Sequence, residues 1–257
     1  WYNLGDGLVG TGRFREAIEA LESALKIDPN HIESWAKLGQ ALRRLDRHAE
    51  ALVAYDQALS LNPTYAWAWN GRGLALEMLD KGEEALASYE KAMAIEKNVV
   101  WYYTNAVDLL IKLQQYNDAL AIIDRALDRL PENSTGWARR AQVLRRLKRF
   151  EEAVESYRKA LDLDPTYAWA WNGLGLAYNA LEAFVDATVC FERAIQHNGD
   201  DAWFWHNHGD ALMRLGDYES AAEKYRRALQ IDPNHEPSRE KLTKAVEHLG
   251  KHADDEE

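Results

Sequence analysis

The chain has 257 residues, of which 47% are hydrophobic and 28% charged, and its 31 Lys and Arg against 42 Asp and Glu give a net charge of −11. This composition is typical of an ordered soluble protein, and its acidic balance disfavours general binding to nucleic acid or to an anionic membrane. No apolar run approaches the ~20 residues of a membrane span, no signal peptide is visible, and the single cysteine, Cys190, excludes an intrachain disulfide.

A 34-residue period runs through the chain from its first residues. The nine residues from Pro63 to Gly71 recur unchanged from Pro165 to Gly173, and the offset of 165 − 63 = 102 residues is three times 34. Such a period is typical of helical repeats, in which each unit packs only on its neighbours. We place a first unit at 1–31, lacking its first three residues, and complete units at 32–65, 66–99, 100–133, 134–167, 168–201 and 202–235.

Large aromatic residues occupy the fourth position of every unit, and alanine occupies the twentieth and twenty-seventh. Small residues let two helices approach closely, and large ones fill the space between them. Apolar residues within a unit follow helical spacing. The fourth-position aromatics are Trp1, Trp35, Trp69, Tyr103, Trp137, Trp171 and Trp205, and the twentieth-position alanines are Ala17, Ala51, Ala85, Ala119, Ala153, Ala187 and Ala221.

On these positions, residues 1–235 resemble the tetratricopeptide repeat (TPR). The resemblance implies an all-α fold, a right-handed α-solenoid or superhelix of helix-turn-helix repeats. It also implies protein binding and no catalytic activity.

The two ends of the array differ from its interior. We expect one amphipathic helix over 236–250, with Leu242, Val246 and Leu249 on one side, to cap the last repeat, and Gly250 to end it. Residues 1–250 then form a single array, followed by a short, mobile charged tail over 251–257. Because the chain begins inside a helical pattern at Trp1, we expect a fragment of a longer protein. Its open apolar edge could stack on another molecule.

The resemblance implies that positions two, five, six, nine, twelve and thirteen of each first helix line a concave groove. Residues at these positions recur every third repeat. Ancestral duplication of a three-repeat block explains this better than a ligand of matching period, because the second helices also resemble each other. Position two holds tryptophan in four repeats, either as extra packing or as exposed anchors for a ligand. These residues are Trp67, Trp101, Trp169 and Trp203.

The groove lining differs in charge from the whole chain. It contains eight basic and five acidic residues, 8 − 5 = +3, whereas the chain carries −11. The partner is therefore expected to be extended, partly apolar and locally acidic, since arginine suits carboxylates. In the opposing interpretation the arginines pair with neighbouring acids. Gly71 and Gly173 indicate close approach, either by a ligand or by a packed aromatic neighbour.

Two binding modes of TPR proteins do not fit the sequence. A carboxylate clamp for a chaperone C-terminus would need five matching positions around Asn105, and only Asn105 and Arg139 match. An asparagine ladder in consecutive repeats is also absent, because Asn recurs at position six only in every third unit.

Motifs for other chemistry are weak. His206 and Asp210 share a helix face, but His208 falls at a packing position, so a metal site is disfavoured. Cys190 is expected to pack as a small hydrophobe, and we find no phosphate loop or nucleophile motif. Side chains that read RNA bases in every unit are also missing. The sequence thus predicts no enzyme activity, no cofactor and no metal.

We therefore predict a cytoplasmic interaction scaffold that binds a protein or peptide in its groove, without nucleic acid or membrane. Two alternatives stay open: a regulatory or substrate-presenting arm of a larger enzyme, and a scaffold that self-associates through its repeat ends. The candidate partner-binding residues are Trp67, Asn70, Trp101, Asn105, Arg139, Arg145, Arg146, Trp169, Asn172, Trp203 and Asn207.

Overall fold

The structure, a computed structural model, describes residues 1–255, and in these residues the only regular secondary structure is helical. The predicted all-α class is confirmed. The helices are α1 (Tyr2–Gly10), α2 (Phe14–Ile27), α3 (Ile32–Arg44), α4 (His48–Leu61), α5 (Ala66–Met78), α6 (Gly82–Ile95), α7 (Val100–Lys112), α8 (Tyr116–Leu127), α9 (Ser134–Arg146), α10 (Phe150–Leu163), α11 (Ala168–Ala180), α12 (Phe184–His197), α13 (Ala202–Leu215), α14 (Tyr218–Ile231) and α15 (Glu236–Asp255).

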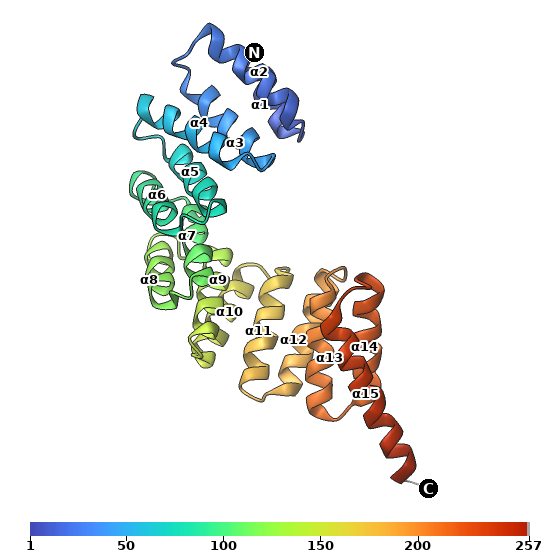
Figure 1. Cartoon of the computed structure of the whole chain (residues 1–257). Coiled ribbons are helices and arrows are strands. Elements are labelled where there is room, and N and C mark those ends of the chain that lie inside the picture. The colour runs from blue at the N-terminus through green and yellow to red at the C-terminus, as the bar shows by residue number, and fades with distance from the viewer. Residues whose placement is uncertain (256–257) are drawn as a thin grey trace. The chain divides into compact units, whose positions relative to one another are not determined.

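The chain forms two compact units, Trp1–Leu130 and the residues from Pro131 onward. The first contains α1 to α8 and the second α9 to α15. In each unit consecutive helices pair as hairpins, and each hairpin packs on the next through its second helix, as α2 does on α3 and α12 on α13 (Figure 1). Each hairpin lies within one of the 34-residue units defined by the sequence.

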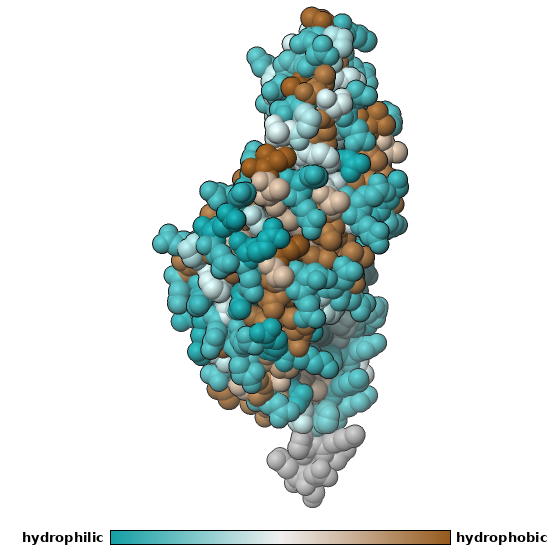
Figure 2. Space-filling view, turned by 90° about the vertical axis from the view of Figure 1, so that its left-hand side faces the viewer, coloured by the Kyte–Doolittle hydropathy of each residue, from teal (hydrophilic) through white to brown (hydrophobic). Residues whose placement is uncertain are grey.

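Small residues at the helix crossings hold the hairpins together. All seven twentieth-position alanines have no exposed surface. A Cβ added at Gly73 would lie 2.5 Å from the ring of Tyr89, and one at Gly175 would lie 2.6 Å from Phe191. The buried rings therefore lie directly against backbone, which explains the pairing of small and large residues seen in the sequence. At the surface, apolar residues appear as patches among polar ones (Figure 2).

From Trp35 onward, the fourth-position aromatics act as staples, because the side chain of each donates a hydrogen bond to the backbone of the turn before its own helix. The indole Nε1 of Trp35 lies 2.8 Å from the carbonyl oxygen of Pro29, and that of Trp205 lies 2.8 Å from Gly199. The remaining staples join Trp69 to Pro63, Tyr103 to Lys97, Trp137 to Pro131 and Trp171 to Pro165. The staples thus fix each first helix to the turn that precedes it.

The turn inside each of the seven hairpins contains one residue with positive φ. In the first and last hairpins this residue is glycine, at Gly12 and Gly216. In the five others a residue with a side chain takes φ values of 57° to 61°. These residues are Asp46, Asp80, Gln114, Lys148 and Glu182. The tight turn is therefore imposed by the packing of the hairpin and not by local glycine preference.

The C-terminal helix differs from the prediction in two ways. α15 continues through Gly250 to Asp255, because a single glycine costs a helix only ~1 kcal/mol and nothing packs against Gly250. Val246 and Leu249, expected to cover the last repeat, are 47% and 36% exposed. Ala245 is buried instead, and Leu242 packs on the same cluster. Of the predicted tail over 251–257, residues 256–257 lie outside the described part.

We predict that Gly173→Ala destabilises the fold by about 1–2 kcal/mol. A Cβ there would lie 2.4 Å from the ring of Tyr157, so overpacking outweighs the gain in helix propensity. Gly7 is the control, since it is also inside a helix but has nothing within 4 Å, and Gly7→Ala should stabilise by about 0.5–1 kcal/mol. Urea unfolding of both variants checks this. Equal effects would contradict the close approach of Tyr157.

Candidate functional site

The groove of the first unit contains a hollow of about 210 Å³ between α3, α5 and α7. All three are first helices of their hairpins. Tyr55 of α4 contributes to the lining from behind. The groove residues that line the hollow are Gln40, Arg43, Trp67, Asn70, Gly71, Leu74, Trp101 and Asn105.

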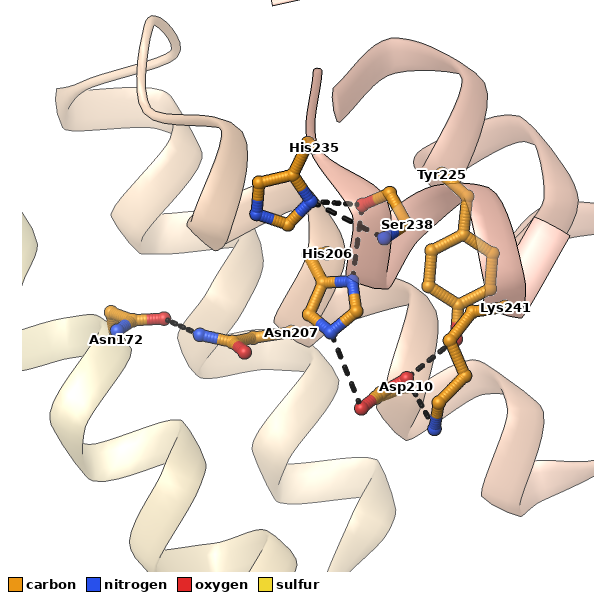
Figure 3. Close-up of polar contacts among 8 residues, drawn as sticks. All are labelled: Asn172, His206, Asn207, Asp210, Tyr225, His235, Ser238 and Lys241. Carbon is orange, nitrogen blue, oxygen red and sulfur yellow. Dashed lines mark hydrogen bonds and ion pairs between the residues drawn. The ribbon is translucent and has the colours of Figure 1, made fainter. Parts of the chain in front are cut away.

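Paired asparagines cross from one repeat to the next in both units. Asn105 Nδ2 donates to Asn70 Oδ1 over 2.8 Å, and Asn207 Nδ2 donates to Asn172 Oδ1 over 2.9 Å (Figure 3). Asn70 and Asn172 are 5% and 8% exposed. Each pair uses one donor and one acceptor, which leaves amide groups able to form further hydrogen bonds. The sequence predicted that these asparagines face the groove, but did not predict that they bind one another.

The four position-two tryptophans divide into two kinds. Trp67 and Trp169 are half-buried and meet Tyr55 and Tyr157 edge-on, at centroid distances of 6.3 and 6.4 Å. A cation lies over each, Lys37 Nζ at 5.3 Å and the Arg139 guanidinium at 5.0 Å. These two therefore serve packing, and the two others, Trp101 and Trp203, are 48% and 51% exposed.

The glycines beside the groove are explained by packing. A Cβ at Gly71 would lie 2.4 Å from Tyr55, and one at Gly173 would lie 2.4 Å from Tyr157. Of the two interpretations of these glycines, the packed aromatic neighbour accounts for the space, and a ligand is not needed to explain it.

Several groove cations are neutralised by acids. Lys37 pairs with Asp6 at 2.8 Å, Lys112 with Glu77 at 3.7 Å, and Arg214 with Glu182 at 3.8 Å. Arg44 is exposed and lies 5.8 Å from the ring centroid of Phe14, outside the hollow. Its counterpart Arg146 is also exposed. The sequence count of +3 already includes Asp6 and Glu77, so these pairs show which groove cations have an acid partner and leave the net count unchanged.

Arg43 and Arg145 are placed differently from Lys37, Lys112 and Arg214. Within the described chain, the Nε of each is buried and has no hydrogen-bond acceptor, and Gln40 Oε1 is likewise unpartnered. A buried polar group without a partner costs ~1–3 kcal/mol. Arg43 lies beside Tyr55, whose pKa burial raises to about 12, so the phenol stays neutral.

A polar network joins α13, α14 and α15 at the end of the second unit. His206 Nδ1 and His235 Nδ1 lie 3.0 and 2.8 Å from Ser238 Oγ (Figure 3). Asp210, predicted to share a face with His206, lies 3.7 Å from its Nε2 and accepts a hydrogen bond from Tyr225 Oη over 2.6 Å. It also pairs with a further basic side chain, Lys241, at 3.0 Å.

Burial decides what this network can do. Ser238 has no exposed surface, and His206 and His235 are 6% and 5% exposed, so no substrate reaches the hydroxyl. The network therefore docks α15. No group of three or more potential metal ligands occurs among the described residues. The sequence reasoning missed His235 and Ser238, although the same pair at His31 and Ser34 could have indicated them.

We predict that stability falls as the pH drops from about 6.5 towards 4. Burial and nearby Lys224 lower the pKa of His208 to about 4, so the unfolded chain takes up this proton first and acidification favours unfolding. The loss should reach about 2–3 kcal/mol. Burial also lowers the pKa of His206, which acts in the same direction. Unfolding free energies near neutral pH and near pH ~4.5 measure the loss.

His208→Leu is the matched variant for this measurement. Leucine occupies the equivalent position at Leu38 and Leu174, so the fold should accept it. The pH dependence should shrink in this variant. An unchanged dependence would assign it to other groups.

The repeats of this chain match sequence models of a known family. Sequence models described as tetratricopeptide repeats match residues 2–66, 37–96 and 202–235, and one described as a TPR repeat matches 141–182. The chain is a tetratricopeptide-repeat protein. No curated protein sequence matches this TPR chain. Of the helices described, none has the length and apolar character needed to cross a bilayer.

Solved structures share the fold of this TPR protein. A tetratricopeptide repeat protein from Parabacteroides merdae matches with a TM-score of 0.71 and 20% identity, over 95% of this chain and 97% of that one. The APC/C heterotetramer Cut9–Hcn1 matches with a TM-score of 0.73 and 16% identity over 95% of this chain. This chain spans only 48% of the matched one. YrrB, described as a TPR protein with an unusual peptide-binding site, matches with a TM-score of 0.56 and 23% identity. The match covers 74% of this chain and 97% of YrrB. The predicted helical-repeat solenoid is confirmed, and this fold generally serves as a protein-interaction scaffold.

Proposed function

We propose that this TPR protein is a non-catalytic scaffold, and that the groove of each unit binds an extended, locally acidic peptide segment. The observation that carries the proposal is Arg43, whose buried Nε has no acceptor and which lines the same hollow as Asn70, Asn105 and the exposed Trp101. In the second unit Arg145 also has a buried Nε without an acceptor, and Asn172 and Asn207 form the same pair.

Each group has a distinct role in this binding. A peptide carboxylate accepts hydrogen bonds from the outer guanidinium nitrogens of Arg43, a charge-assisted interaction. An apolar peptide side chain packs on Trp101, which buries much area at little entropic cost. The free amide groups of Asn70 and Asn105 bind the peptide backbone. Arg145, Trp203, Asn172 and Asn207 have the same roles in the second unit.

An array of immobilised peptides in which acidic and aromatic content vary independently tests the proposal. The chain should retain acidic peptides with aromatic residues best, and Arg43→Glu with Arg145→Glu should lose them. Arg44→Glu with Arg146→Glu is the control, since it changes the same charge at exposed neighbours. Equal retention of basic and acidic peptides, or unchanged capture by the first variant, would refute groove binding.

Self-association is a second candidate function. Trp1, Leu4 and Ile27, on and beside the first hairpin, are 63%, 52% and 74% exposed. A second copy could cover them. Light scattering over a range of concentrations should show a mass increase that Leu4→Lys removes, and a constant monomer mass would reject this candidate.

A further inference from the structure

The second unit contains a pocket outside the groove, lined by α10, α11 and α12. Its volume is about 360 Å³. Leu174 and Cys190, 3% and 4% exposed, form its floor, and Val189 is 51% exposed. Trp171 and Tyr178 also line it.

A comparison within the chain explains why this pocket exists. Residues 66–75 and 168–177 are identical except at one position, where the first has Arg72 and the second Leu174. In the first unit the Arg72 side chain fills the equivalent space. Its Nε donates to Asp56 over 2.7 Å, and its Nη1 donates to Ser88 over 2.8 Å.

The second unit has different residues at all three positions of that bridge. Leu174 stands for Arg72, Arg158 for Asp56 and Cys190 for Ser88. Another hairpin has the polar arrangement, since Arg140 Nη1 donates to Ser156 Oγ over 2.7 Å. Where the first unit has a polar bridge, this hairpin therefore has an apolar hollow.

The charges at the rim of the pocket are unevenly satisfied. The Arg158 guanidinium is engaged, with Nη2 2.5 Å from Tyr178 Oη and its centre 5.9 Å from that ring. Asp162 and Asp186 are exposed, and neither has an ion-pair partner within residues 1–255. Burial raises the pKa of Cys190 to about 12, so the floor stays uncharged. The pocket lining therefore carries two carboxylates and one guanidinium, a net charge of 1 − 2 = −1.

We propose that this pocket binds a peptide segment that inserts one large apolar side chain flanked by lysine or arginine. The volume lies near the low end for ligand pockets, which suits a single side chain. The flanking cations would pair with Asp162 and Asp186. This preference is opposite in charge to that proposed for the grooves, so the two proposals stand or fall separately.

The probe is the peptide acetyl-Lys-Phe-Lys-amide, followed by the indole N–H resonance of Trp171 in the folded chain. This resonance can be assigned with Trp171→Phe. The peptide should shift it saturably, and acetyl-Glu-Phe-Glu-amide should bind at least about tenfold more weakly because two attractive contacts become repulsive. Acetyl-Lys-Ala-Lys-amide should not saturate. An equal response to the Lys-flanked and Glu-flanked peptides would overturn the proposal.

The chain supplies a filled-pocket variant that should fold. Leu174→Arg, Cys190→Ser and Arg158→Asp together copy Arg72, Ser88 and Asp56, and should abolish the shift while circular dichroism stays unchanged. Val189→Lys should also block binding, whereas Val185→Lys, at a residue 64% exposed that does not line the pocket, should not. Binding retained by both pocket variants would refute the site.

Discussion

We expect each chain to bind two molecules of the same acidic peptide, one in each groove, with similar affinity. The two units present the same groups, since Gln40, Arg43 and Trp101 of the first correspond to Gln142, Arg145 and Trp203 of the second. Calorimetry with the peptide that the array retains best should give two peptides bound per chain. Arg43→Glu should reduce this to one, because losing a charge-assisted hydrogen bond weakens that site roughly ten- to hundredfold.

Single-site variants separate the two grooves. Arg145→Glu should also leave one peptide bound, and Arg43→Glu with Arg145→Glu should leave none. Arg44→Glu adds the same charge outside the hollow and should keep both sites. One peptide bound to the unaltered chain would show that the duplicated residues do not form duplicated sites.

Ser238→Ala should cost about 2–4 kcal/mol, a large part of the stability of a typical domain. The hydroxyl lies within hydrogen-bond distance of two buried imidazoles, and its removal leaves both nitrogens without that partner. Because this contact attaches α15, the backbone amides of α15 should be the first to lose protection from hydrogen exchange in the variant. Hydrogen exchange along α15, combined with urea unfolding, measures both effects.

Ser60→Ala is the control for this prediction. Its hydroxyl is exposed and donates only to the carbonyl of Gln57 in its own helix. The expected change is within about 0.5 kcal/mol. Similar losses in the two variants would mean that Ser238 does not carry the docking of α15.

The helix pairs could be predicted from the sequence because the same 34-residue period recurs in every repeat. The alanine and aromatic positions predict helices that cross closely, and Ala17 and Tyr55 are buried as that pattern requires. The capping helix was less predictable. Leu242, Val246 and Leu249 satisfy a helical apolar pattern, but Ser238 and Ala245 make the buried face, since small residues allow α15 to approach α13 and α14 closely.

The groove register could be predicted, but the state of each side chain could not. Arg43 and Arg44 are adjacent and chemically identical, yet one lines the hollow and the other lies near Phe14. Trp67 and Trp101 share a repeat position, but Tyr55 and Lys37 flank only the first. These differences depend on neighbours in adjacent repeats, which no pattern within one repeat records.

The aromatic staples have a consequence for how such a chain can evolve. Their acceptors are backbone carbonyls, and they form equally with Pro63, Lys97 or Gly199 at the turn. Mutation of the turn residue therefore leaves the staple intact. Each 34-residue repeat carries the aromatic residue that attaches it to the repeat before it. Gain or loss of a whole 34-residue repeat would therefore preserve the stapled turns, while contacts specific to particular repeats, such as Asn105 with Asn70, would change.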